Sequence, residues 1–429
     1  MRYTLLLACF LVGCHPGSSS SATFSVATNS QKSIVHIKPG PNVQEELLTA
    51  LIKAKPGTVI EMAEGLYEFT ASLSLTQPGV TLRGAGPDKT ILSFKKQDQG
   101  KEGLIVSVGD FAAENFTLQD SKGDGIKVVG GTNVAFQKVR VRWTEGPKPT
   151  NGGYGIYPVT CTNVLIEKCE ADGASDAGIY VGQSKQVIIR ECKAHRNVAG
   201  IEVENSTEVD VHDNIATNNS GGILVFDLPN LPVKNGKQVR VFRNKVVGNN
   251  HDNFAPPGNI VSTVPPGTGL MILATDQVEC FNNEVTQNQT TGLAIISFQL
   301  VGKEFAADKQ YDPYPEGLFI HDNRFAENGS KPSGEMGMQL GMLLGKPMPD
   351  ILYDGNINSK KLVDGKLPEA LSLKLMNNGE ATFANLHYDG GNVLKYALSK
   401  PKIDRTTTAH EGKHEPLAGI ILKPMPHQQ

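Results

Sequence analysis

The stretch GIYVGQSKQVIIRECKAHRNVAGIEV, residues 178–203, contains one complete repeat and the beginning of the next. It opens with a glycine followed by an apolar residue, and this short motif returns 22 residues later. Neighbouring copies lie 22 or 23 residues apart except where segments are inserted, and a fixed period of this kind indicates a repeat architecture. The copies begin at Gly125, Gly155, Gly178, Gly200, Gly222, Gly269 and Gly292.

A second apolar segment keeps the same period, and its lead residues are Val164, Val187, Val209, Val239, Val278 and Leu318, with a weaker copy at Val134. Two strands of four or five residues per repeat leave no room for connecting helices, which favours a parallel β-solenoid. Asparagine tolerates the left-handed backbone of a tight turn, and stacked asparagines can bond in ladders at about 4.8 Å. We therefore expect turns and ladders at Cys169, Cys192, Asn214, Asn244, Asn283 and Asn323, and at Asn197, Asn219, Asn249, Asn288 and Asn328.

These repeats resemble the right-handed parallel β-helix (pectin-lyase-like) superfamily, and more narrowly its bacterial β-helix repeat lipoproteins. The segment NVQEELLTALIKAKPGTVIEMAEGLYEF is similar to the opening of that family, where an amphipathic helix covers one end of the solenoid. The resemblance implies an all-β, single-domain right-handed parallel β-helix over residues 33–400, with a short N-terminal capping helix and an irregular C-terminal cap. The polar residues 401–429 are predicted to form a loose tail.

The first residues predict a targeting signal. One cationic residue and a short apolar run precede Leu11-Val12-Gly13-Cys14, which resembles the lipobox of bacterial lipoproteins. We expect residues 1–13 to be a lipoprotein signal peptide, Cys14 to be lipidated, and residues 14–32 to be a flexible tether. The alternative is an ordinary signal peptide with an incidental cysteine. The histidine after Cys14 favours the outer membrane, with the protein facing the periplasm or the exterior.

The remaining composition limits the partners. A net charge of −3 gives no indication of nucleic-acid binding, and no apolar run has transmembrane length, so a lipid anchor is the only membrane contact expected. No cofactor is expected, and Ca²⁺ stays an alternative that no motif supports. HEGKH at 410–414 matches a zinc-protease pattern but is interrupted by glycine, so we interpret it as a chance match. The methionines Met336, Met338, Met342 and Met348 would suit copper, which leaves a copper-related accessory role as a minor alternative to packing.

Cys169 and Cys192 occupy equivalent positions one repeat apart. Their separation is within reach of a disulfide, but parallel side chains disfavour that bond. The sequence leaves both the disulfide and unbonded stacking open.

One face of the solenoid carries the candidate site. In the glycine-led strand Ile and Val point inward, so the residues between them face outward. Long insertions at 144–153, 227–236, 250–268 and 299–316 flank this strand and are expected to wall a groove, since long loops on a rigid scaffold usually carry function. We predict a substrate-binding set of Trp143, Tyr157, Gln183, His195, Glu204 and Asp227, and a catalytic set of Asp176, Tyr180, Arg196 and Glu202.

A groove of this kind suits an extended polysaccharide, and the resemblance implies lyase, epimerase or hydrolase chemistry. Hydrolysis requires an acid and a base, which Asp176, Glu202 and Glu204 could supply. Proton abstraction beside a uronate carboxyl requires a neutraliser and a base, for which Arg196 with Tyr180 or His195 would serve. The alternative class is a non-catalytic envelope assembly or accessory module that acts with a protein partner.

Overall fold

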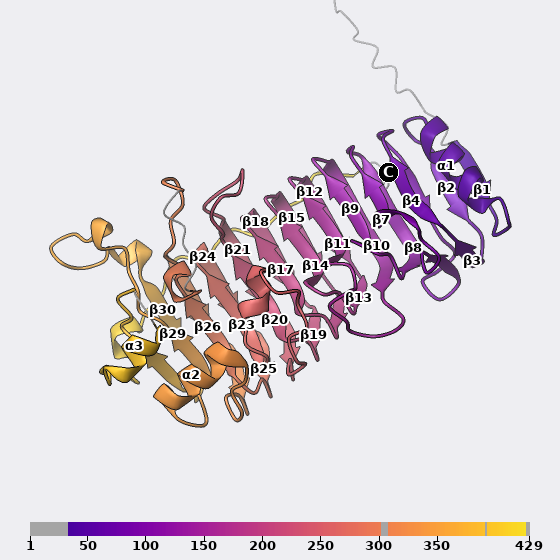
Figure 1. Cartoon of the computed structure of the whole chain (residues 1–429). Helices are drawn as coiled ribbons and strands as arrows, with labels where there is room; N and C mark the ends of the chain where they lie inside the picture. The colour runs from indigo at the N-terminus through magenta and orange to yellow at the C-terminus, as the bar shows by residue number, and fades with distance from the viewer. Residues whose placement is uncertain (1–32, 302–307, 391–392, 426–429) are drawn as a thin grey trace, which may run out of the picture. The chain divides into compact units, whose positions relative to one another are not determined.

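The computed structural model describes residues 33–301, 308–390 and 393–425. These residues form a stack of parallel coils that begins at α1 and β1 and ends at β29, β30 and α3 (Figure 1). All the named strand pairs are parallel, and equivalent residues of successive repeats lie opposite each other, as in Ile179 opposite Ile201. The predicted solenoid is therefore confirmed. Residues 1–32, which include Cys14, lie outside the described residues.

One sheet consists of the glycine-led strands and carries the candidate site on its outer face. It has 11 strands in the order of the chain. They are β4 Ala71–Leu75, β7 Gln99–Val106, β9 Ile126–Val129, β11 Tyr154–Val159, β14 Ala177–Gly182, β17 Ala199–Glu204, β20 Gly221–Phe226, β23 Thr268–Leu273, β26 Thr291–Ile296, β29 Ile351–Tyr353 and β31 Phe383–Asn385.

The second sheet has 20 strands and forms the other two faces of each coil. One row contains β1 Ile34–Ile37, β2 Val59–Met62, β5 Thr81–Arg83, β12 Thr162–Glu167, β15 Lys185–Arg190, β18 Thr207–His212, β21 Lys237–Phe242, β24 Asp276–Phe281, β27 Leu318–His321 and β30 Leu373–Met376. The other row contains β3 Gly65–Glu68, β6 Thr90–Ser93, β13 Glu170–Asp172, β16 Lys193–His195, β19 Ile215–Thr217, β22 Lys245–Val247, β25 Glu284–Thr286 and β28 Arg324–Ala326. The long strands β8 Phe111–Gln119 and β10 Thr132–Arg142 belong to both rows. The repeat thus has three strands where the sequence pattern predicted two. The pattern missed the third strand because it has only three residues and one inward side chain.

The helices lie at the two ends and in the insertions. The predicted capping helix is confirmed as α1 Val43–Lys53, whose Val43, Leu47 and Leu51 are buried against the first coil. The others are α2 Gly334–Leu344, α3 Val393–Leu398, and the 3₁₀ turns η1 Ile260–Thr263, η2 Phe298–Val301, η3 Ser359–Lys361, η4 Glu369–Leu371 and η5 Thr408–His410. No helix within residues 33–301, 308–390 and 393–425 has the length and apolar character needed to cross a bilayer.

The core consists of columns of aliphatic side chains that follow the predicted period. Ile156, Ile179 and Ile201 are fully buried at equivalent positions, and Ile223 continues the column. Each lies opposite isoleucine in the neighbouring coils, except that Leu270 follows Ile223, so the interior is a continuous apolar stack. The predicted division into inward and outward positions is correct for this strand.

Both predicted asparagine ladders are present. The Nδ2 of Asn244 donates to Oδ1 of Asn283 at 3.0 Å, and the Nδ2 of Asn214 donates to Oδ1 of Asn244 at 3.0 Å. The second ladder joins Asn197, Asn219, Asn249, Asn288 and Asn328 in the same way. One detail of the prediction is wrong, because the left-handed residue is the one before each ladder asparagine in the first ladder, such as Arg243 with φ 53°. The ladder residue itself is selected for its amide.

The cysteines at the start of the first ladder are not bonded. Cys169, Cys192, Cys161 and Cys280 are all free and buried. The backbone N–H of Cys169 donates to Sγ of Cys192 at 3.4 Å, and the backbone N–H of Cys192 donates to Oδ1 of Asn214 at 2.9 Å. Of the two alternatives that the sequence left open, the structure shows unbonded stacking.

The predicted loose tail is wrong for residues 411–425, here called the C-terminal strap. The strap runs back across the coils, because its His414 bonds the carbonyl of Ser372 whereas its Lys423 donates to Asn163. The backbone N–H groups of Leu417 and Ile420 donate to Glu279 and Asp210 at 2.8 and 3.1 Å. Met425 is buried among Ala112, Ala135, Leu165 and Ile188. The prediction rested on the polar composition of the segment. That composition does not indicate the few apolar contacts and the side-chain to backbone hydrogen bonds that hold the strap.

Candidate functional site

A cavity of about 510 Å³ opens on the outer face of the 11-stranded sheet. We call it the carboxyl cavity. Its base comes from three successive strands, β11, β14 and β17, and its walls come from residues 228–231, residues 259–261 and Phe298. Its lining comprises Tyr154, Tyr157, Asp176, Tyr180, Gln183, Glu202, Glu204, Leu228, Pro229, Asn230, Leu231, Asn259, Ile260, Val261 and Phe298.

Strand register brings the central residues together. Tyr180 lies opposite Glu202, and Gly182 lies opposite Glu204 on the neighbouring coil. A side chain on Gly182 would collide with the Tyr180 ring, since an added Cβ would lie 2.3 Å from the Tyr180 hydroxyl. Glycine at this position lets the Tyr180 ring extend along its own strand, where its hydroxyl donates to Oε1 of Glu204 at 2.5 Å.

Three tyrosines form an aromatic cluster beside the carboxyl groups. The ring centroid of Tyr154 lies 4.5 Å from that of Tyr157 and 4.4 Å from that of Tyr180. Lys127 lies next to the cavity on the preceding coil, with its Nζ 4.8 Å from the Tyr157 ring centroid and 3.7 Å from Asp124. The cavity therefore combines flat apolar rings with hydroxyl groups, a combination suited to ligands with both apolar and polar faces.

The three carboxyl groups of the cavity are buried close together without a cation. Burial, with the charges of Glu204 and Asp124, raises the pKa of Asp176 to about 7, although Nδ2 of Asn259 donates to it at 2.9 Å. Burial also raises the pKa of Glu202 well above its usual range, and Asp176 and Glu204 add to the effect. The pKa of Glu204 is raised by burial but lowered in part by the Tyr180 hydroxyl. None of the described lining residues is Lys or Arg, so the carboxyl groups resist ionisation.

The wall at residues 227–236 is held firmly at both ends. The backbone N–H groups of Asn235 and Gly236 donate to the Asp227 carboxyl at 3.0 Å each. Asn205 donates to the backbone carbonyl of Leu228 and accepts from its N–H, at 2.9 and 2.8 Å. The Tyr311 hydroxyl donates to the carbonyl of Asp227 at 2.7 Å, so the later insertion braces the earlier one.

Six of the predicted site residues line the cavity, namely Asp176, Tyr180, Glu202, Tyr157, Gln183 and Glu204. Asp227 does not, because its carboxyl accepts from the loop backbone; burial raises its pKa to about 8. It is a positioning residue for the wall rather than a ligand contact.

Three further predictions are wrong. Trp143 is 5% exposed, packs in the core, and donates its Nε1 to the carbonyl of Ser121, so it has no ring face for a sugar. His195 and Arg196 belong to the third face of the coil, where His195 bonds Glu170 at 2.9 Å and Arg196 pairs with Asp172. Because His195 and Arg196 are close in sequence to the glycine-led strand β17, the sequence predicted that they lie on the rim of the same groove. The chain bends between β16 and β17, however, and this places them on another face.

The sequence reasoning missed Tyr154, Asn259 and Phe298 as lining residues. Tyr154 lies at the first position of β11, two residues before the inward Ile156, so strict alternation would have placed its side chain inward. Asn259 and Phe298 come from insertions whose internal conformation no repeat constrains. The predicted wall at 144–153 is absent from the cavity lining, whereas 227–236 and 250–268 contribute to it as expected.

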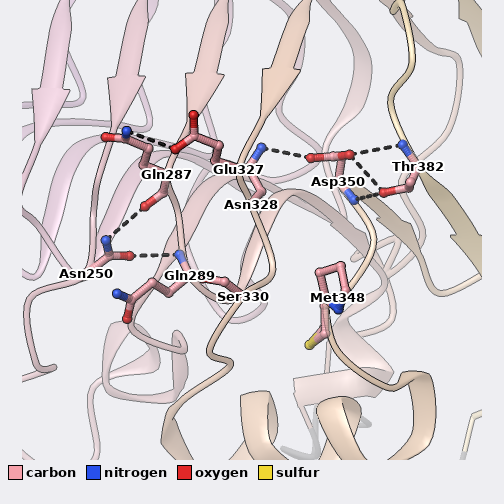
Figure 2. A pocket seen from close by; sticks show the side chains of 10 residues that line it. Asn250, Gln287, Gln289, Glu327, Asn328, Ser330, Met348, Asp350 and Thr382 are labelled. Atoms are coloured by element: carbon pink, nitrogen blue, oxygen red, sulfur yellow. Dashed lines mark hydrogen bonds between the residues drawn. The ribbon is translucent and has the colours of Figure 1, made fainter.

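A second, larger cavity of about 680 Å³ lies farther along the coils, below the second asparagine ladder. Figure 2 shows its polar side chains bonded to each other: Gln287 donates to Glu327 at 3.1 Å, Asn328 donates to Asp350 at 2.9 Å, and Thr382 donates to Asp350. None of the described residues that line this cavity has a buried side-chain polar atom without a partner.

The two metal patterns do not form compact sites. Met338 and Met342 are exposed on α2, whereas Met348 is buried, so the methionines face different surroundings. His410 ends the 3₁₀ turn η5, and HEGKH does not form an α-helix. Within the described residues no group of three or more His, Cys, Asp or Glu side chains has the arrangement of a metal site.

Comparison with known proteins agrees with the architecture. A family model described as "Right handed beta helix region" matches residues 104–255. The A-module of mannuronan C-5 epimerase AlgE4 from Azotobacter vinelandii has a TM-score of 0.53 at 15% identity, covering 81% of this chain and 91% of that one. An alginate lyase from Paenibacillus sp. gives 0.44 at 14% identity, covering 70% and 95%.

A pre-neck appendage protein of Bacillus phage B103 is 23% identical over 202 residues. The matched region is 38% of this chain and only 24% of the phage protein. The observed coils, the family-model match and the likeness to the epimerase define the class: the chain is a right-handed parallel β-helix of the pectin-lyase-like fold.

Proposed function

We propose that the protein binds carbohydrate in the carboxyl cavity and cleaves a glycosidic bond by acid–base catalysis. The observation that carries this proposal is the cluster of Asp176, Glu202 and Glu204, which are buried together with raised pKa values beside three tyrosines. Glycoside hydrolysis requires one carboxyl group that is protonated near neutral pH and one that is ionised. The Azotobacter vinelandii protein that shares this fold is by its name an epimerase of mannuronan, a carbohydrate, which agrees with this class of ligand.

The surroundings separate the roles of the carboxyl groups. Asp176, with a pKa of about 7, keeps about half of its population protonated at neutral pH, where an ordinary aspartate is ionised, and would serve as the general acid. Glu204 receives the Tyr180 hydroxyl, which favours its ionised form, so it would serve as the base or nucleophile. Glu202 lies between them in register and would bind the sugar that reacts.

Elimination from a uronate is the less favoured route. It requires a cation to neutralise the substrate carboxylate, and Arg196 is engaged with Asp172 on another face. The cavity lining, as described, supplies carboxyl groups and no Lys or Arg. An anionic sugar would therefore meet charges of its own sign unless those groups were protonated.

A glycan panel tests the proposal. We expect reducing ends to appear from at least one neutral polysaccharide, and Asp176→Asn and Glu204→Gln to reduce that rate at least 100-fold. Glu191→Gln is the matched control, since Glu191 lies exposed on another face of a coil that contributes to the site. Ultraviolet absorbance from unsaturated ends would instead indicate a lyase, and absence of binding to every glycan would refute the proposal.

The cellular setting is also a proposal. A lipobox-like LVGC at residues 11–14 and the serine-rich residues after it support an outer-membrane lipoprotein anchored at Cys14. The folded coils would then face the periplasm or the exterior, where polysaccharides of the cell envelope are accessible.

A second candidate is a non-catalytic module that binds a protein partner in the envelope, with a copper-related accessory role as its minor form. The C-terminal strap favours it, because Asp210, Glu279 and Asn163 already hold an extended peptide through its backbone. Purification of the intact protein with a stoichiometric partner, together with no glycan binding, would favour this candidate over the first.

A further inference from the structure

The outward row of the 11-stranded sheet passes from exposed to buried toward the carboxyl cavity. Ser74 is exposed, Ile105, Lys127 and Tyr157 are half-buried, and Tyr180 is 3% exposed. These residues occupy equivalent positions on successive coils. A ligand lying along this row would therefore descend from an open surface into the cavity.

Beyond Glu202 the same row is completely covered. Its next members, in register, are Leu224, Met271, Ala294, Leu352 and Ala384, and each is at most 5% exposed. They pack against Leu228, Val261, Phe298 and Leu340, which come from the insertions and from α2. Hydrophobic packing thus fills the space that a groove would need to continue.

The covering segments cannot move aside without loss of several contacts. Asp227 and Asn205 anchor residues 227–236 through hydrogen bonds at 2.8–3.0 Å, and Tyr311 adds a third anchor. Asn259, from the second wall, donates to Asp176 inside the cavity. The structure therefore has a groove that is open on the side of β9 and closed on the side of β20.

The cavity also contains two acceptors that lack donors. Oε1 of Gln183 and Oε2 of Glu202 are buried and have no hydrogen-bond partner in the described part of the chain. An unpartnered buried acceptor is costly, and a ligand hydroxyl that donates to it removes the cost. Two such acceptors beside tyrosine rings suit an uncharged polyhydroxylated ligand.

We propose that the carboxyl cavity binds the end of a neutral glycan chain, which enters over β7, β9 and β11 and stops against residues 228–231 and 259–261. This inference deepens the proposed function and rests on it. A volume of about 510 Å³ is typical of a small-molecule pocket and holds terminal residues rather than a polymer segment that passes through. The sequence predicts a groove for an extended polymer, and on this proposal the polymer extends from the cavity in one direction only.

The experiment compares linear and cyclic glycans of the same linkage, α-1,4-glucans with cyclodextrins and linear with cyclic β-glucans, by titration calorimetry on the intact protein. For any linkage that binds, we expect the linear chain to bind at least tenfold more tightly than the ring. We also expect cleavage to release products of one short length. A ring bound as tightly as the chain would overturn the inference while leaving carbohydrate binding intact, whereas absence of binding to every glycan would refute the proposed function and the inference with it.

An opened variant adds a second measurement. Residues 229–234 are replaced by Gly-Gly-Ser, and Asp227, Asn235 and Gly236 are kept because they anchor the loop. We expect this variant to accept cyclic glycans that the natural protein rejects, with an unchanged circular-dichroism spectrum. Continued rejection by a folded variant would contradict the inference, and if the variant does not fold, the comparison of linear with cyclic glycans on the natural protein decides.

Discussion

Replacing Asp176 by asparagine should make the stability of the protein less dependent on pH. Asparagine has nearly the same shape and keeps an oxygen that accepts from Asn259, so packing in the cavity should change little. The substitution removes the carboxyl group that titrates. Burial raises the pKa of Asp176 from 3.8 to about 7 in the folded chain, and in the unfolded chain the group returns to its ordinary value.

The sign follows from the raised pKa. Well below pH 3.8 Asp176 is protonated in both states, and its full contribution to folding is present. As the pH rises toward 7 the unfolded chain gains by ionising while the folded chain resists, so stability falls until the group ionises in both states. A difference of one in pKa corresponds to about 1.36 kcal/mol, so a rise of about 3 lowers the free energy of unfolding by an amount on the order of 4 kcal/mol between pH 4 and pH 8. The asparagine variant should not show this loss.

The assay is urea unfolding of the natural and variant proteins at five pH values from 4 to 8. The quantity compared is the variant's free energy of unfolding minus that of the natural protein, in which titration of all other groups largely cancels. Asp213→Asn is the control, because hydrogen bonding to Arg243 lowers the pKa of Asp213 to about 2 and leaves it ionised in both states above pH 5. The reasoning is refuted if the difference for Asp176→Asn stays constant, or falls, as the pH increases.

Three further outcomes test other parts of the structure. Asn244→Ala removes four ladder hydrogen bonds and should lower the free energy of unfolding by about 4 kcal/mol; a loss below about 0.5 kcal/mol would contradict the ladder's role. Met425→Ala should cost about 2 kcal/mol and Ile421→Ala, which is 87% exposed, almost nothing; equal melting temperatures would show that the strap is not held. Cys14→Ser should leave an unprocessed precursor on an immunoblot, and normal processing would exclude the lipoprotein assignment.

The repeat made most of the fold predictable. A period of 22 or 23 residues with alternating apolar positions identifies the inward column through Ile201 and both asparagine ladders, because each coil must satisfy the same register. The third strand escaped prediction, since three residues such as those of β16 carry too little alternation to detect. The strap escaped because it contacts coils 210 and 260 residues earlier in the chain through Ile420 and Lys423, and no local pattern reports such pairings.

The candidate site was predictable where register determines it and not elsewhere. Tyr180, Glu202 and Glu204 follow from the alternation of two adjacent strands. His195 ends β16, only a few residues before β17, but the bend between these strands places it on another face of the coil. A linear pattern does not reveal the angle of that bend. The closure of the groove depends on how the insertions pack, and insertions are free of the repeat that made the rest of the chain regular.

The residues at the covered end of the groove can be compared with those at equivalent positions in the open end. Leu224, Met271 and Ala294 occupy the same register positions as Tyr180 and Glu202 and pack there as apolar side chains. Stability alone would therefore be served by extending the apolar row, since a buried carboxyl group without a cation costs free energy that leucine does not. Glu202 is buried to the same degree as those neighbours and still carries a carboxyl oxygen without a partner. The row changes from the carboxyl of Glu202 to Leu224 at the point where the insertions begin to cover it, and this change supports the proposal that Glu202 serves ligand binding.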